Sequence, residues 1–282
     1  MIYKNIDIHN AAELDISDAD GSMTWLRAPR RVYDSIETGN GRRMLRGSTG
    51  VELRFVINSG RAVIRMRSLS DKTMHAQFHI FRGAVQGGWT DHELNTFVPP
   101  EPADFIIERS DNLPALRAMT AERGSSFAPE VVRVIFDRGE ICVLDAYGDI
   151  APPKPEQLPP RTLLCYGSSI THGSNSIDFS HAWPSVLADR LDMDLRDLGM
   201  AGSCAMEPEM IGYIASEGEK GRWDTAVLEL GINVLDWPMD KIYERVSNTL
   251  SQIAGRNCSK PVYVISPFYC SSDFHKKPEP DN

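Results

Sequence analysis

Short apolar runs alternate with stretches of helical periodicity from residue 162 onward, and this alternation constrains the fold more than any other feature. Strands are predicted at 162–166, 194–198, 225–230 and 261–266, and helices at 181–191, 207–216 and 239–254. Strands that alternate with helices form a parallel sheet with helices on both faces. The second half therefore predicts a three-layer α/β domain with a flavodoxin-like strand order.

The first 150 residues show a different pattern, in which β-rich runs are separated by turn residues and helical periodicity is hard to find. Hairpins are predicted at 51–66 around Asn58-Ser59-Gly60 and at 131–147 around Asp137-Arg138-Gly139. Further strands are predicted at 74–81 and 105–108. We expect an all-β sandwich domain over residues 1–150. Residues 151–160 hold five prolines and predict a semi-rigid linker to the second domain, 161–282.

Composition narrows the classes of partner. There are 30 Lys and Arg against 39 Asp and Glu, a formal charge of −9, which argues against nucleic acid. No apolar run approaches the ~18 residues that a membrane helix needs, and the opening residues do not resemble a secretory signal. We expect a cytoplasmic protein that does not bind membranes. The five cysteines are widely spaced without a CxxC pair, so we expect reduced thiols and neither a disulfide framework nor a zinc ribbon. Since the sequence also has no P-loop or GxGxxG motif, we expect neither a metal nor an organic cofactor.

Chemistry-bearing residues follow three of the predicted parallel strands, at the edge of the sheet where ligands bind in such folds. Ser169 lies in a glycine-flanked turn after the first strand, which exposes its hydroxyl as a nucleophile. Gly202 follows the second strand and Asn233 the third. The N–H groups of Ser169 and Gly202 and the side chain of Asn233 can donate to one oxygen, which is the outline of an oxyanion hole.

These positions also resemble a known family. Gly167-Ser168-Ser169-Ile170-Thr171 resembles the GDSL-type nucleophile block of the SGNH hydrolases, and residues 197–202 and 229–233 resemble their second and third blocks. The resemblance covers about 161–270 and implies that Ser169 is the nucleophile and that Gly202 and Asn233 complete the oxyanion hole. It implies a serine esterase or acylhydrolase that forms an acyl-Ser169 intermediate.

The layout of the whole chain resembles the SGNH esterase subgroup with an N-terminal carbohydrate-binding-like domain, which implies a small or carbohydrate-like ester as substrate. Two competing functions stay open: an acyltransferase, in which an alcohol replaces water, and a non-catalytic carbohydrate-binding protein on a silent SGNH scaffold. Transfer and hydrolysis differ only in the acceptor, whereas a silent scaffold would not turn over esters.

The sequence departs from the family pattern at three points. Ser168 and Val234 replace residues that are usually aspartates, and the late Asp-x-x-His block that supplies the general base is not found. Three accounts of the base are open. In the first, which we favour, the chain is truncated and the block lies beyond Asn282. In the second, His275 is the general base, with Asp273 nearby. In the third, His172 is the general base. Truncation would leave one sheet face without its closing helix, so we expect the sandwich domain or a second subunit to cover it.

For two further groups of residues, we prefer an interpretation that involves no ligand. His75 and His79 fall on one face of a predicted strand and could contact a metal or a sugar, but such a pair more often lies on a half-exposed strand face. Arginines 42, 43 and 46, near arginines 27, 30 and 31, could hold an anion. Solvated charge around a loop is the simpler expectation.

Overall fold

The second half of the chain is built on a four-stranded parallel sheet, as predicted. The computed structural model describes residues 1–70, 76–87 and 96–268. The strand order is β13-β12-β14-β15, with all pairs parallel. This is the flavodoxin-like order, and the predicted elements are confirmed to within a few residues. The strands are β12 (Thr162–Gly167), β13 (Asp194–Gly199), β14 (Thr225–Glu229) and β15 (Val262–Ile265), and the helices are α4 (Trp183–Leu191), α5 (Pro208–Glu219) and α6 (Met239–Arg256).

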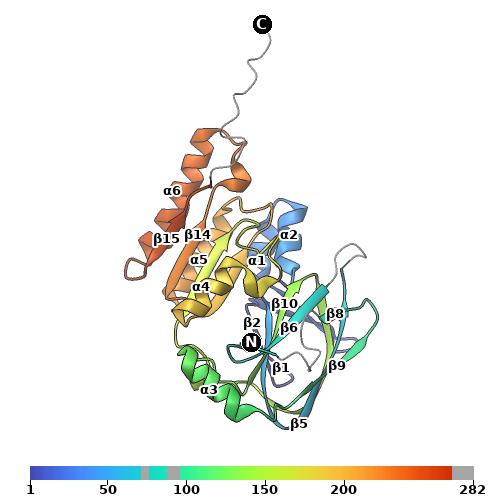
Figure 1. Ribbon diagram of the computed structural model, residues 1–282. Coiled ribbons are helices and arrows are strands. Elements are labelled where there is room, and N and C mark those ends of the chain that lie inside the picture. Colours follow the sequence, from blue (N-terminus) through green and yellow to red (C-terminus); the bar gives the residue numbers. More distant parts are fainter. Residues whose placement is uncertain (71–75, 88–95, 269–282) are drawn as a thin grey trace.

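Helices cover both faces of this sheet (Figure 1). Side chains of β12 alternate between the faces, so Leu164 and Tyr166 pack with α5 and α6 while Leu163 and Cys165 pack with α4. Ile135 of the first half is buried in the second of these clusters. The first half therefore covers part of that face. In β15, however, Tyr263 is 60% exposed and Val264 47% exposed, so the cover that we expected does not extend over the fourth strand in the described residues.

An antiparallel sheet dominates the first half, where eleven strands are found among the described residues. Its apolar core is one cluster, in which Phe78 packs edge-on against Phe105 and Phe136. The strands are β1 (Ile2–Tyr3), β2 (Ile6–His9), β3 (Glu13–Ile16), β4 (Met23–Leu26), β5 (Glu52–Ser68), β6 (Ala76–Arg82), β7 (Val85–Gln86), β8 (Thr96–Val98), β9 (Ala103–Glu108), β10 (Val131–Arg138) and β11 (Ile141–Ala151).

Both predicted hairpins are wrong in their pairing. Asn58-Ser59-Gly60 does not reverse the chain but lies inside β5, a single strand of 17 residues in which Gly60 has φ +64°. The first part of β5 pairs with β10 and the later part with β9. β10 and β11 do not pair with each other, because β5 lies between them. The residues typical of a turn lie within this long strand, and its extent is set by the strands that pair with it, which are distant in the sequence.

Three helices in the first half contradict the expectation that it is all β: α1 (Arg30–Ser35), α2 (Gly39–Arg46) and α3 (Leu113–Arg123). α1 and α2 are too short for a period to be recognised, and α3 buries only Thr120, so it has no apolar stripe. Val32, Ile36 and Leu45 of the α1–α2 segment are buried in the same core as α5. In packing terms, residues 28–45 belong with the parallel sheet despite the predicted boundary at 150.

Two buried arginines of the first half hold β13 at its two ends. Arg54 of β5 donates from Nη1 and Nη2 to the Asp194 carboxylate at 2.8 and 2.6 Å. Arg27 donates from Nη2 to Asp197 Oδ2 at 2.9 Å and from Nη1 to the Gly199 carbonyl at 3.1 Å. Both arginines are fully buried. The expectation of solvated charge is therefore wrong for Arg27, which fixes the first half against the end of β13 that leads to Gly202.

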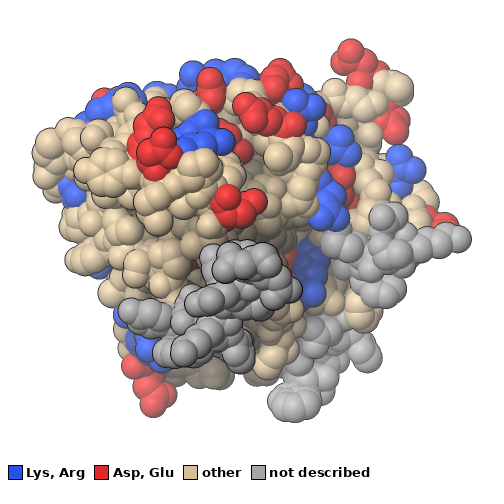
Figure 2. All heavy atoms as spheres, turned by 90° about the horizontal axis from the view of Figure 1, so that it is seen from above, with Lys and Arg blue, Asp and Glu red and all other residues tan. Residues whose placement is uncertain are grey.

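The predicted linker is packed rather than free. β11 continues to Ala151, residues Pro155–Gln157 form a 3₁₀ turn, and the Gln157 carbonyl accepts from the Ala128 N–H at 3.0 Å. On the face seen from above, basic and acidic side chains are interspersed (Figure 2). None of the helices in the described residues has the length and apolar character needed to cross a bilayer.

Candidate active site

The three predicted catalytic loops leave the same edge of the parallel sheet from adjacent strands. Gly167 at the end of β12 is in register with Gly199 of β13, and Tyr166 is in register with Leu228 of β14, so Glu229 ends beside Gly167. Ser169 follows its strand by two residues, and Gly202 and Asn233 follow theirs by three and four. The structure thus brings the three predicted residues to one edge of the sheet.

Hydrogen bonds tie these loops together. The Met200 N–H donates to the Gly167 carbonyl at 2.8 Å, joining the second loop to the first. The Cys204 N–H donates to Asn233 Oδ1 at 3.0 Å, joining the second loop to the third. Because the amide oxygen of Asn233 is occupied, its Nδ2 is left as the donor. Gly202 is exposed between these contacts, with φ +66°.

The two adjacent serines of the first loop have different environments. Ser168 is buried, and both its N–H and its Oγ donate to Glu229 Oε2, at 2.7 and 2.6 Å. Ser169 is only partly buried, and its carbonyl accepts from the Ser174 N–H at 2.9 Å. Across the described residues, the Ser169 hydroxyl has no hydrogen-bond partner. Ser168 is held as a structural group, which leaves the hydroxyl of Ser169 available.

Glu229 explains the departure from the family at position 168. Its side chain is buried, and Oε2 accepts from Thr171 Oγ1 at 3.1 Å in addition to the two bonds from Ser168. A Cβ on Gly167 would lie 2.7 Å from this oxygen, so only glycine allows the approach. A carboxylate from the end of β14 therefore accepts the hydrogen bonds of the first loop. Nothing in the sequence pattern singles out Glu229 except its acidic side chain at the end of a buried strand.

Asn40 of α2 braces the second loop from outside the parallel-sheet half. Its Nδ2 donates to the Ala201 carbonyl and to Ser203 Oγ, both at 2.7 Å. These are the residues on either side of Gly202. The Asn40 Oδ1 accepts from Arg43 Nη2 at 2.8 Å, which fixes the orientation of the amide. A side chain from the first half therefore positions the predicted oxyanion-hole glycine.

His172, one of the three candidate bases, stands over the second loop. A Cβ added to Gly199 would lie 2.4 Å from the His172 Cα. Burial, followed by the positive charges of arginines 27, 138 and 43, lowers the pKa of His172 to about 3. Such a weakly basic imidazole is a poor proton acceptor at neutral pH, so its position favours a wall of the site over the general base. His275 and Asp273 lie outside the described residues.

Of the remaining described histidines, His79 differs from the expectation of a half-exposed strand face. His79 is buried rather than half-exposed, and its Nε2 lies 4.0 Å from Asp178 Oδ2; His75 lies outside the described residues. Asp178 and His181 form an Asp-x-x-His spacing early in the domain, with Nδ1 and Oδ1 2.9 Å apart. The described residues contain no group of three or more His, Cys, Asp or Glu side chains suited to a metal ion.

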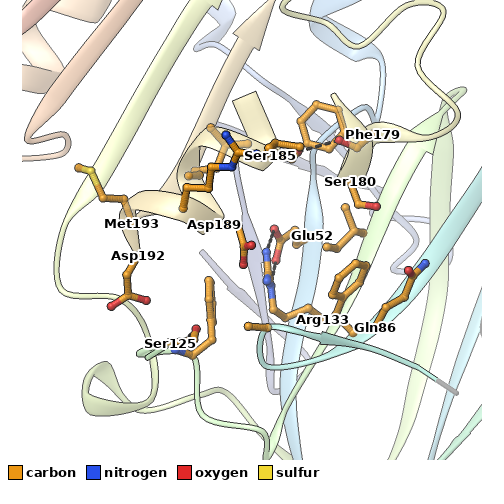
Figure 3. Close-up of a pocket in the computed structure, with 18 of the residues that line it drawn as sticks. Glu52, Gln86, Ser125, Arg133, Phe179, Ser180, Ser185, Asp189, Asp192 and Met193 are labelled. Atoms are coloured by element: carbon orange, nitrogen blue, oxygen red, sulfur yellow. Dashed lines mark hydrogen bonds and ion pairs between the residues drawn. The ribbon is translucent and has the colours of Figure 1, made fainter. Parts of the chain in front are cut away.

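Of the three cavities that the described residues form between the halves of the molecule, the one lined by residues 7–12, β13 and α5 has no residue of the predicted catalytic loops in its wall, and the other two differ in position. One, of about 260 Å³, contains the bidentate pair of Arg133 and Glu52 in its wall and is bordered by Ser180 and Met193 (Figure 3). His181 lines this cavity. The other, of about 310 Å³, is lined by residues 172–175 and Ala201 from the catalytic loops and by α2 and the β10–β11 turn from the first half. Only the second cavity adjoins the predicted site.

Comparisons with known proteins agree with this geometry. Residues 160–278 match the model of a GDSL-like lipase/acylhydrolase family. Among solved structures, the chain is similar to the salicylyl-acyltransferase SsfX3 from a tetracycline biosynthetic pathway, with a TM-score of 0.66 and 15% identity over 92% of this chain and 71% of the other.

A second similar structure is a GDSL-like lipase described as putative, from Bacteroides ovatus, with a TM-score of 0.57 and 15% identity over 92% and 71% of the two chains. No curated protein sequence matches the chain. At such low identity the solved structures support the fold, while the family model covers all three loops. Residues 160–278 are therefore similar to the GDSL-like lipase/acylhydrolase family, and the two solved structures agree with that fold.

Proposed function

We propose that the protein is a serine hydrolase that removes or transfers the acyl group of a small or carbohydrate-like ester through an acyl-Ser169 intermediate. The single observation that carries this proposal is the contrast between the two serines. Glu229 accepts from the Ser168 hydroxyl, whereas the neighbouring Ser169 hydroxyl has no hydrogen-bond partner in residues 1–70, 76–87 and 96–268 and lies at the edge of the sheet. A nucleophile needs this freedom to reach a carbonyl carbon.

The reaction follows from the donors around Ser169. Its Oγ attacks the ester carbonyl while a general base accepts the hydroxyl proton. The Ser169 and Gly202 N–H groups and Asn233 Nδ2 donate to the oxygen that gains negative charge. The tetrahedral intermediate then expels the alcohol, which takes the proton from the base. Water or a second alcohol attacks the acyl-enzyme in the same way and gives hydrolysis or transfer.

The bonds around Gly202 and Asn233 support this assignment. The amide oxygen of Asn233 is held by the Cys204 N–H and Asn40 brackets Gly202, so both donors are oriented before any substrate arrives. Preorganised donors cost no reorganisation during the reaction, and loss of one typically costs ~3 to 4 kcal/mol of transition-state stabilisation. Acyl transfer is the second candidate, favoured by the similar structure that is named an acyltransferase.

For the first half, we propose a carbohydrate-binding-like β-sandwich that helps to hold the substrate. Its support is the wall that this half contributes to the 310 Å³ cavity beside Ala201. A domain that lines the site can select the part of the ester that does not react.

The test is turnover of p-nitrophenyl acetate by the wild-type chain, by Ser169→Ala and by Ser168→Ala. We expect Ser169→Ala to abolish turnover, because no other hydroxyl takes its place. Ser168→Ala should retain measurable acylation, since it removes a structural hydrogen bond. Wild-type turnover that survives in Ser169→Ala would contradict the proposal. So would a wild-type chain that is inert and not acylated and that stays inert when it is extended beyond Asn282.

A further inference from the structure

We propose that the 310 Å³ cavity beside the catalytic loops binds a carboxylate group of the ester substrate, with Arg43 as the residue that recognises it. This inference rests on the proposed function and names the substrate class: a small ester that carries a negative charge away from the reacting carbonyl. The cavity is of the size that holds a small organic group.

The location of the cavity connects it to the reacting centre. On one side it is lined by His172, Gly173 and Ser174, which begin three residues after Ser169, and by Ala201, which precedes Gly202. On the other side it is lined by α2 and the β10–β11 turn. A ligand in this space therefore lies next to both the predicted nucleophile loop and the predicted oxyanion loop.

The wall holds two arginines, 43 and 138, and two carboxylates, and Arg46 next to the cavity adds a third cation that pairs with one of them. Asp137 and Glu140 are the carboxylates of the cavity, and each already has an arginine partner. Arg138 Nε lies 3.3 Å from Asp137 Oδ2, and Arg46 donates to both oxygens of Glu140 at 3.0 and 3.2 Å. Within the described part of the chain, Arg43 has no carboxylate partner. Its guanidinium is the unneutralised charge of the cavity.

The Arg43 guanidinium is also anchored. Nη2 donates to Asn40 Oδ1, and Asn40 in turn donates to the Ala201 carbonyl, so the guanidinium is two hydrogen bonds away from the oxyanion loop. Its remaining N–H groups keep the planar fork that suits a carboxylate. The nearby imidazole of His172 experiences the positive charge of Arg43, in agreement with a cation directed toward this space.

The matched ligands differ at one end of the molecule, which is a carboxylate in one and a methyl ester in the other, and the variants differ in the position of the lost cation. Monomethyl succinate, which has one carboxylate, and dimethyl succinate, which has none, are titrated by calorimetry into Ser169→Ala protein, where turnover cannot interfere. The same titrations are made with Arg43→Gln and Arg42→Gln added. Arg42 lies on the same helix but outside the cavity, where its Nε donates to the Ile36 carbonyl.

We expect the anionic ester to bind more tightly than the neutral one, and Arg43→Gln to weaken the anionic ester roughly 10-fold or more while the neutral ester is unaffected. Arg42→Gln should change either affinity less than 2-fold by the same reasoning. Equal binding of both esters, no binding of the anionic ester, or equal losses in the two variants would overturn the inference.

These outcomes are separate from those of the proposed function. Binding is measured without the nucleophile, so a charge-selective cavity in a chain that never acylates Ser169 would refute the proposed function and leave the anion site standing. Ser169-dependent turnover of neutral esters with no charge selectivity would refute only the anion site.

Discussion

Glu229→Gln tests whether the Glu229 carboxylate stabilises the first loop. The change keeps the size of the side chain and one acceptor oxygen but removes the negative charge. In the wild-type protein one carboxylate oxygen accepts from the Ser168 N–H, the Ser168 hydroxyl and the Thr171 hydroxyl, at 2.7, 2.6 and 3.1 Å. All three donors are buried.

The magnitude follows from the difference between charged and neutral acceptors. A hydrogen bond to a charged group contributes about 1.5 to 3 kcal/mol to stability, against about 1 kcal/mol for a neutral pair. Three such bonds predict a loss of about 1.5 to 6 kcal/mol in the free energy of unfolding. This is a large fraction of the ~5 to 15 kcal/mol that a typical protein has. Turnover should fall as well, because the same bonds fix the loop that carries Ser169.

Urea unfolding at neutral pH measures the loss in the free energy of unfolding. An unchanged dependence of this free energy on urea concentration shows that only stability has changed. Glu219→Gln is the matched control, because Glu219 forms an exposed ion pair with Arg256 and its removal should leave the unfolding midpoint unchanged. The reasoning is refuted if Glu229→Gln unfolds at the wild-type urea concentration and retains wild-type turnover.

Placing the family's usual aspartate at position 168 tests the same idea from the other side. Ser168→Asp alone should destabilise the protein, since its carboxylate would lie against that of Glu229 in a buried site. Combined with Glu229→Gln it should recover part of the lost stability, because one carboxylate again serves the loop. Additive losses in the double variant would show that the two positions are not coupled.

Three further predictions concern the contacts between the halves. Asn40→Ala should lower kcat about 10- to 100-fold with little change in KM, because Gly202 loses its brace, and equal changes in both constants would contradict this. Because the pKa of His172 is about 3 in the folded state against 6.5 in the unfolded state, its contribution to stability should fall by about 1.4 kcal/mol per pH unit between pH 6.5 and 3. His172→Gln should flatten this slope in pH-dependent urea unfolding. Arg27→Leu should cost about 3 to 5 kcal/mol by leaving Asp197 buried and unpaired, and Arg27→Leu with Asp197→Leu should recover most of it in the same assay.

The parallel-sheet half could be predicted because its signals are local. Each buried parallel strand is a short apolar run, and in α6 the side chains of Ile242, Val246 and Leu250 repeat on one face and pack on the sheet core. The site loops then follow from topology, because residues after parallel strands share one edge. Ser169, Gly202 and Asn233 come to adjoining loops for this reason, and their catalytic roles stay predictions.

The antiparallel half could not be predicted to the same depth, because its pairing depends on distant partners. β5 looks like two strands with a turn, yet it runs on through Gly60 since β9, β10 and β11 pair along it. The roles of Arg27 and Glu229 likewise cannot be predicted from the residues next to them in the sequence. The partner of Arg27 is 170 residues away in the chain and that of Ser168 is 61 residues away.

A crystal structure of the chain after reaction with a p-nitrophenyl alkylphosphonate tests the central claim most directly, because the phosphonyl oxygen mimics the oxyanion. The account predicts a covalent bond to Ser169 Oγ, with that oxygen about 2.7 to 3.1 Å from the Ser169 and Gly202 N–H nitrogens and from Asn233 Nδ2. A phosphonyl group on another residue, or an oxygen directed away from Gly202 and Asn233, would contradict it.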